Sequence, residues 1–135
     1  MAERFTVGEV EDAARLILLD DYENAYRFEP GEMYAAMKDG LIRLRRERPA
    51  SRYVGGVLVD LEFVGDGTSR TDIPMDLDDE NRAVFRAMEV TMESRWKEAV
   101  VYYVVHRMYL KDDADTKNDN LATTYFNMYT AACGG

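Results

Sequence analysis

The most apolar stretch of the chain runs from Trp96 to Leu110, with the sequence WKEAVVYYVVHRMYL. Ala99, Val100 and Tyr103 fall on one stripe of a helix, and the other valine, methionine and tyrosine side chains extend the apolar surface well past that stripe. A helix that is apolar around most of its circumference must be covered on several sides. The pattern therefore predicts a central core helix around which the other elements pack.

Four other stretches place nonpolar residues at the i, i+3 and i+4 positions that form one face of a helix. The first begins at a capping-box sequence, Thr6 to Glu9, and the second begins at Pro30, a residue suited to the first helical turn. The third has an aspartate cap at 78 or 79, and its spacing fits both a helix continuous with the central one and a break near 91–94. The predicted helices, including the central one, span residues 7–20, 30–47, 78–92, 94–111 and 116–132.

The pattern changes from helical to alternating after Gly55-Gly56. The strand expected there alternates Val57, Val59, Leu61 and Phe63 with Leu58, Asp60 and Glu62. Gly65-Asp66-Gly67 favours a turn, and a second strand can return to Ile73, which predicts a hairpin over residues 54–75. Because a two-stranded hairpin is only marginally stable in water, it must pack on the helices or on neighbouring copies of the chain.

These elements together predict a mainly α fold, a helical bundle of four to five helices with an inserted β-hairpin. A chain of 135 residues is long enough for one hydrophobic core but not for two. We therefore expect a single domain over residues 1–135.

The chain is acidic, with 17 Lys and Arg against 26 Asp and Glu and a formal net charge of −9 at pH 7. This balance argues against nucleic-acid binding as the main activity, because affinity for the phosphate backbone depends on clustered cations. It fits simple solubility, and it equally fits a surface past which DNA slides without sticking. With no apolar secretory or membrane-spanning run and a single cysteine, Cys133, the sequence predicts a soluble protein made in a reducing cytoplasm.

One basic cluster stands out, in the last turn of the helix predicted over 30–47. It consists of Arg43, Arg45, Arg46 and Arg48. Cations at this position suit the negative end of the helix dipole, so a capped and solvated helix end accounts for them. A patch that docks on a partner accounts for them as well, and the sequence leaves both interpretations open.

No stretch of the sequence carries recognisable catalytic or metal-binding chemistry. The acidic connector over 111–120 lacks the glycine and the terminal glutamate of an EF-hand loop. His106 is the only histidine, and no serine, cysteine or second histidine lies at a readable spacing from it. Phosphate-binding glycine loops are missing too, so we expect no enzyme activity, no cofactor and no metal.

Three stretches in order resemble the head-to-tail adaptor (connector) proteins of tailed bacteriophages. The first runs through the second helix and its exit, and the second is the strand leading to Ile73-Pro74. The third comprises the central helix, the polar connector and the last helix. The matching residues are Arg27-Phe28, Glu32, Asp39-Gly40, Leu41 and Arg48-Pro49-Ala50, then Glu98 to Tyr109, Lys111-Asp112, Asn118, Ala122 and Tyr125-Phe126. The resemblance covers roughly residues 20 to 130.

The resemblance implies a structural protein of the virion neck, made in the bacterial host cytoplasm. Such adaptors form a homo-oligomeric ring, typically twelvefold, that binds the portal protein above and the tail or next neck protein below. The ring extends the DNA channel, and DNA passes through it without specific binding. The interface residues we expect are Arg43, Arg45, Arg46, Arg48, Val57, Val59, Leu61, Phe63 and Ile73. The alternative is a small soluble helical regulatory or binding module that works in the cytoplasm.

Overall fold

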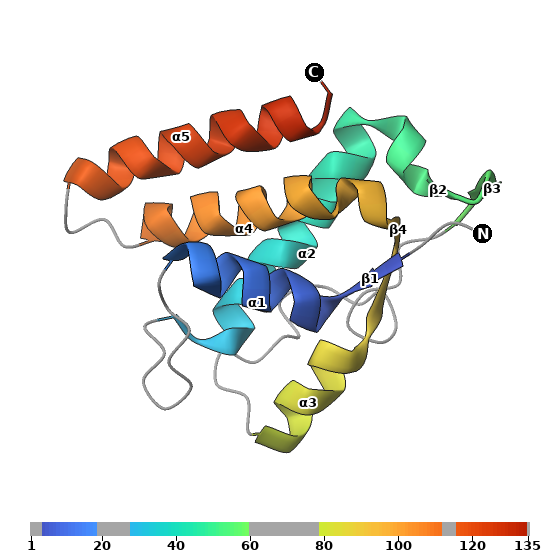
Figure 1. Ribbon diagram of the computed structural model, residues 1–135, viewed down its shortest axis with the longest axis horizontal. Coiled ribbons are helices and arrows are strands. Elements are labelled where there is room, and N and C mark those ends of the chain that lie inside the picture. Colours follow the sequence, from blue (N-terminus) through green and yellow to red (C-terminus); the bar gives the residue numbers. More distant parts are fainter. Residues whose placement is uncertain (1–3, 19–27, 60–78, 112–115, 135) are drawn as a thin grey trace.

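A computed structural model describes residues 4–18, 28–59, 79–111 and 116–134 of the chain (Figure 1). The helices are α1 (Val7–Leu18), α2 (Pro30–Glu47), α3 (Asp79–Ala87), α4 (Lys97–Lys111) and α5 (Thr116–Ala132). The strands are β1 (Arg4–Thr6), β2 (Tyr53–Val54), β3 (Val57–Leu58) and β4 (Glu89–Glu93). Short 3-10 turns, η1 (Pro49–Arg52) and η3 (Ser94–Trp96), lead into β2 and α4. The predicted fold class, a helical bundle with a β-hairpin, is confirmed.

Helix α4 forms the centre of the bundle, as its apolar circumference predicts. Figure 1 shows α5 along one side of it and α1 along the other, with α2 crossing behind, and α4 contacts all three. Val100, Val104 and Val105 are fully buried. Burial of each such side chain contributes roughly 1.5–3 kcal/mol to folding. None of the described helices is long and apolar enough to cross a membrane.

The ring of Tyr103 on α4 lies against the backbone of α2 at Gly40. A Cβ atom at this position would lie 2.7 Å from Cδ1 of Tyr103, a distance that side chains do not tolerate. Glycine at this point of the helix therefore allows the tyrosine ring to lie against α2. The same ring meets Tyr129 of α5 edge to face at a centroid distance of 5.3 Å, so one side chain joins three helices.

The sequence prediction was wrong in the second half of the 78–92 segment. Helix α3 ends at Ala87, and Glu89–Glu93 forms β4, which pairs antiparallel with β1. Val90 and Met92 alternate with glutamates at 89 and 93, and both are fully buried. Alternate burial is typical of a strand with one face on the core. The strand and η3 also separate α3 from α4, so these two helices are not continuous.

The hairpin formed by β2 and β3 turns at Gly55-Gly56. Both glycines have positive φ, 59° and 82°, which a two-residue hairpin turn requires and which glycine adopts without steric cost. The sequence pattern placed the turn of the predicted hairpin at 65–67 instead. That later turn and the returning strand lie outside the described residues.

Candidate functional site

The four arginines at the end of α2 differ in their contacts with the rest of the protein. Arg43 pairs through Nε with Glu47, and its guanidinium lies 4.8 Å from the ring centroid of Phe126 on α5. The hydrogen bond from Arg43 to Glu47 is the main cause of a raised pKa of this arginine. Arg45 donates from Nη2 to the carbonyl oxygen of Val59 at 2.7 Å. These two arginines therefore attach α2 to α5 and to the segment that leaves β3.

Arg46 and Arg48 occupy different environments at the same helix end. The backbone N–H of Arg48 donates to the carbonyl oxygen of Leu44 at 2.8 Å, and the carbonyl of Arg48 accepts from Ser51, so this residue closes the helix. The Arg46 side chain is exposed, and it has no ion pair with another described residue. It borders a shallow hollow of about 330 Å³ next to Ile42, whose side chain is itself 41% exposed. The side chain of Arg43 is also 40% exposed, and both interpretations of the cluster, a capped helix end and a patch that docks on a partner, stay predictions.

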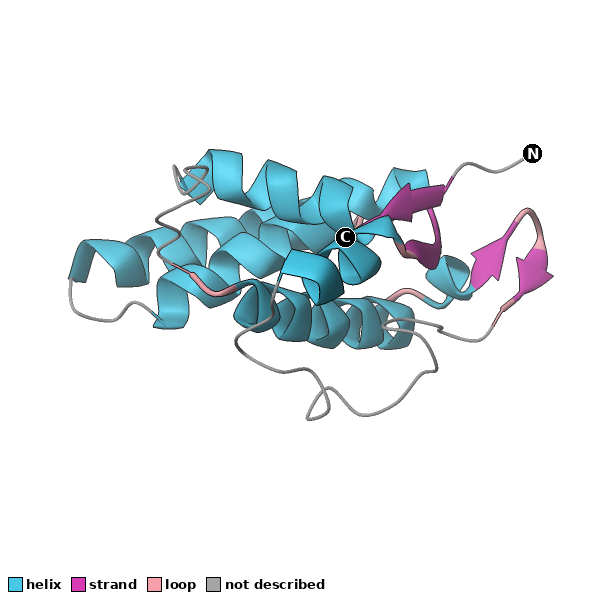
Figure 2. Ribbon diagram, turned by 90° about the horizontal axis from the view of Figure 1, so that it is seen from below, coloured by secondary structure: helices cyan, strands magenta, loops and turns pink. Residues whose placement is uncertain are grey.

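The hairpin carries exposed apolar side chains at one end of the molecule. Figure 2 shows β2 and β3 beyond the ends of the helices. Tyr53, Val57 and Leu58 are 44%, 64% and 61% exposed. Gly55 donates its backbone N–H to Oε2 of Glu93 at 3.0 Å, so the turn is fixed to the body of the protein through β4.

The structure brings several of the predicted interface residues together. The bond from Arg45 to Val59 places the arginine-rich helix end directly beside the hairpin. We call this region, made of the exposed residues Arg52, Tyr53, Val57 and Leu58, the hairpin end; Val59 donates its backbone N–H to the carbonyl oxygen of Arg52 at 3.0 Å. Val59 is half-buried next to it. The other three predicted residues, Leu61, Phe63 and Ile73, lie outside the described residues.

The hairpin end is also the basic part of an acidic chain. Residues 43–59 contain five arginines and one glutamate, a net charge of +4, whereas the whole chain carries −9. The remaining residues therefore carry −13. The acidic charge of the chain therefore lies outside residues 43–59.

A second cluster of charges, which the sequence did not reveal, surrounds Glu11. This carboxylate on α1 is fully buried and accepts hydrogen bonds from three helices. The donors are Arg15 Nε at 2.8 Å, the Tyr34 hydroxyl at 2.7 Å, Arg82 Nη2 at 2.9 Å and Arg86 Nη1 at 2.8 Å. Burial raises the pKa of Glu11, but the hydrogen bonds from Tyr34, Arg15 and Arg86 outweigh it, so the pKa is lowered overall.

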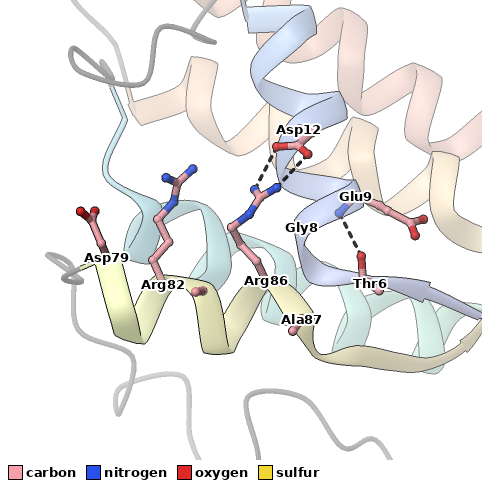
Figure 3. A pocket seen from close by; sticks show the side chains of 9 residues that line it. Thr6, Gly8, Glu9, Asp12, Asp79, Arg82, Arg86 and Ala87 are labelled. Atoms are coloured by element: carbon pink, nitrogen blue, oxygen red, sulfur yellow. Dashed lines mark hydrogen bonds and ion pairs between the residues drawn. The ribbon is translucent and has the colours of Figure 1, made fainter.

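Arg86 continues this cluster to the surface. It donates from both terminal nitrogens to the two carboxylate oxygens of Asp12, at 2.9 and 2.8 Å, as Figure 3 shows. The hydrogen bonds to Asp12 are the largest contribution to a raised pKa of Arg86. A bidentate pair of this kind fixes the orientation of α3 as well as its distance from α1.

A cleft of about 660 Å³ opens beside this pair, between α1 and α3. Its polar lining consists of Thr6, Glu9, Asp12, Asp79, Arg82 and Arg86. Glu9 also pairs with Lys97 at 3.3 Å. Among the described residues no group of three or more histidine, cysteine, aspartate or glutamate side chains could hold a metal ion. The paired charges along the cleft hold two helices together.

His106 makes contacts of a structural kind. Its Nδ1 lies 2.8 Å from the carbonyl oxygen of Ala122, and because a carbonyl only accepts, Nδ1 carries the proton in the neutral ring. The imidazole also packs against the rings of Tyr103 and Phe126, at centroid distances of 5.8 and 5.0 Å. Burial lowers the pKa of His106 and favours this neutral form.

Comparison of the chain with protein-family models, with curated proteins and with solved structures found no match. A function proposed for the chain therefore rests on its own residues and on their geometry.

Proposed function

We propose that this chain is a head-to-tail adaptor of a tailed bacteriophage, whose copies form a closed ring between the portal protein and the tail. The observation that carries the proposal is the hairpin end, where exposed apolar side chains and an exposed arginine lie together on an otherwise acidic protein. A helical bundle that holds a protruding hairpin also agrees with the fold expected from the sequence.

The hairpin end has the properties of one half of a subunit contact. Two strands of two residues each are too small to be stable alone, and their open edges can pair with a neighbouring chain. Tyr53, Val57 and Leu58 would lose their exposed apolar surface to such a neighbour, which is the main source of favourable free energy in association. The basic charge of this end then selects an acidic surface on the next copy.

Contact between two different surfaces of identical subunits propagates in one direction. Such a heterologous contact forms a ring when the rotation between subunits closes, and an open filament when it does not. In the proposed function the contact closes, and the ring joins the portal protein to the tail or next neck protein. The net charge of −9 keeps DNA from adhering to the channel, because the excess of acidic side chains repels the phosphate groups.

A pair of matched substitutions tests the proposal in virion assembly. Leu58→Asp places a charge in the hairpin end, whereas Leu16→Asp places the same charge at an equally exposed leucine of α1, 63% against 61% exposed. Both variants should fold, since neither side chain is buried. We expect Leu58→Asp to abolish most DNA-filled, tailed particles and Leu16→Asp to leave their number unchanged. Normal tailed particles with Leu58→Asp would exclude the hairpin end as a subunit contact.

A further inference from the structure

Helix α3 is attached to the rest of the protein without burying any of its residues. All of the side chains from Asp79 to Ala87 are exposed or half-buried, and Val84 is 55% exposed. Its main neighbour is α1. One apolar contact is a stacked pair of rings, Phe85 on Tyr34 of α2, with centroids 5.6 Å apart. A helix with so little buried apolar surface depends on other interactions to stay docked.

Those interactions include ion pairs that reach the protein surface. Arg82 binds Glu11, and Arg86 binds both Glu11 and Asp12. The side chains of Arg86 and Asp12 are 30% and 64% exposed, so water and salt reach this pair. Ion pairs in contact with solvent weaken as the ionic strength rises, because the screening length falls from about 30 Å at 0.01 M to about 3 Å at 1 M salt.

When α3 undocks, the buried carboxylate of Glu11 keeps two of its partners. Glu11 keeps the guanidinium of Arg15, which lies on its own helix and is 2% exposed, and it keeps the hydroxyl of Tyr34. Removal of the only partner of a buried charge is strongly destabilising. Glu11 keeps two partners in the core when α3 undocks. The loss of Arg82 and Arg86 therefore costs far less free energy than leaving the buried carboxylate with no partner.

The C-terminal end of α3 is fixed to α1 and to β1. Val7 donates its backbone N–H to the carbonyl oxygen of Met88 at 3.0 Å, and β4 follows at once and pairs with β1. At Gly8 a Cβ atom would lie 3.0 Å from the carbonyl oxygen of Arg86, so α1 and α3 touch closely there. A movement of α3 would therefore pivot about residues 87–89.

We propose that α3 is an ionic latch: it docks on α1 through Arg82 and Arg86 and undocks as a unit about residues 87–89, while α1, α2, α4 and α5 stay packed. In the undocked state the face that carries Arg82, Phe85 and Arg86 is free to bind elsewhere, and Asp12 on α1, already 64% exposed, loses Arg86 as its partner. The latch is a property of the folded chain and holds whether or not the chain assembles into a ring.

Hydrogen–deuterium exchange followed by mass spectrometry of peptides tests the latch in the full chain. Raising NaCl from about 0.01 M to about 1 M should speed amide exchange over 79–87 by about tenfold and leave exchange over 97–111 unchanged. Asp12→Asn should speed exchange over 79–87 by about fivefold at low salt and reduce its response to salt, since one of the ion pairs is gone. Asp12 is well exposed, so this variant retains the core.

Two further variants separate a latch from general loosening. Gly8→Ala adds a methyl group on α1 against Arg86 of α3 and should also speed amide exchange over 79–87. Alanine favours helix formation in α1, so faster exchange in α3 would come from the contact and not from a weaker α1. Glu98→Gln removes an exposed carboxylate from α4 and should change neither region. The proposal is overturned if neither salt nor Asp12→Asn changes the rate of amide exchange over 79–87. It is also overturned if that rate always changes together with the rate over 97–111.

Discussion

The substitution Glu11→Gln tests whether the charge cluster stabilises the protein. It keeps the volume of the side chain, removes its charge and replaces one of its two acceptor oxygens with an NH2 group, which cannot accept from the donors around it. Glu11 is fully buried, and three arginines converge on it. In the variant these guanidinium groups repel one another without the carboxylate that now neutralises them.

The cost depends on how much of the cluster can reach water. Breaking a buried ion pair by removing one partner costs about 3–5 kcal/mol. Arg82 and Arg86 are 13% and 30% exposed and can turn toward solvent, whereas Arg15 at 2% cannot. We therefore expect a loss at the lower end, about 3 kcal/mol. For a domain of this size that corresponds to a fall in Tm of roughly 10 °C.

Urea unfolding followed by circular dichroism measures this loss directly. The matched control is Glu98→Gln, because Glu98 accepts a hydrogen bond from Tyr102 at the surface of α4. An exposed substitution of this kind should change the free energy of unfolding by less than about 0.5 kcal/mol. If Glu11→Gln proves as stable as Glu98→Gln, the account of Glu11 as an electrostatic centre of the fold is incorrect.

Two further predictions concern the core and the response to pH. Gly40→Ala should destabilise the protein by about 1–3 kcal/mol in urea unfolding, because its Cβ meets the ring of Tyr103 and this overpacking exceeds the gain in helix propensity; an unchanged or raised stability would contradict the close contact of the Tyr103 ring with α2. Because burial lowers the pKa of His106, the unfolded chain takes up a proton first as the pH falls below about 6.5, and the stability should fall with it. His106→Asn can still donate to the carbonyl of Ala122, so it should remove this part of the pH dependence in unfolding curves between about pH 7 and 5; an unchanged pH profile would assign that dependence to other groups.

The helices of the bundle could be predicted from the sequence because their signals are local. The nonpolar stripe after Pro30 and the basic turn before Pro49 enclose α2, whose bounds, Pro30–Glu47, match the prediction. At the start of α1, the backbone N–H of Glu9 donates to the hydroxyl of Thr6 at 3.2 Å, which is one of the two bonds of the expected capping box. These features depend on neighbours within one or two turns.

Strand β4 could not be predicted from the same kind of pattern. Val84, Met88 and Met92 follow one another at the i, i+4 spacing of a helix, which favoured a helix through 92. The strand exists because β1, far away in the sequence, offers backbone hydrogen bonds to it and because Val90 and Met92 both reach the core. Pairing over such a separation leaves no mark in a local window.

The Glu11 cluster could not be predicted for a related reason. An acidic residue beside a nonpolar stripe is most often solvated, and nothing local to α1 sets Glu11 apart from that rule. Its burial depends on Tyr34, Arg82 and Arg86, which the fold brings from two other helices. Glu11 and Arg15 do have the i, i+4 spacing of a helix ion pair, but exposed pairs share that spacing, so it does not predict burial.

The hairpin end could be predicted in part. The arginines and the alternating Val57 and Val59 were visible in the sequence, as was the change of period after Gly55-Gly56. The different roles of the arginines were not, because they depend on the positions of Phe126 and of the Val59 carbonyl.

The most direct test of the adaptor proposal is quantitative mass spectrometry of purified, DNA-filled virions produced from the genome that encodes this chain. The proposal predicts that the chain is part of the particle, in a fixed ratio to the portal protein that corresponds to one ring. A chain that remains in the host cell lysate and is missing from tailed particles would contradict it.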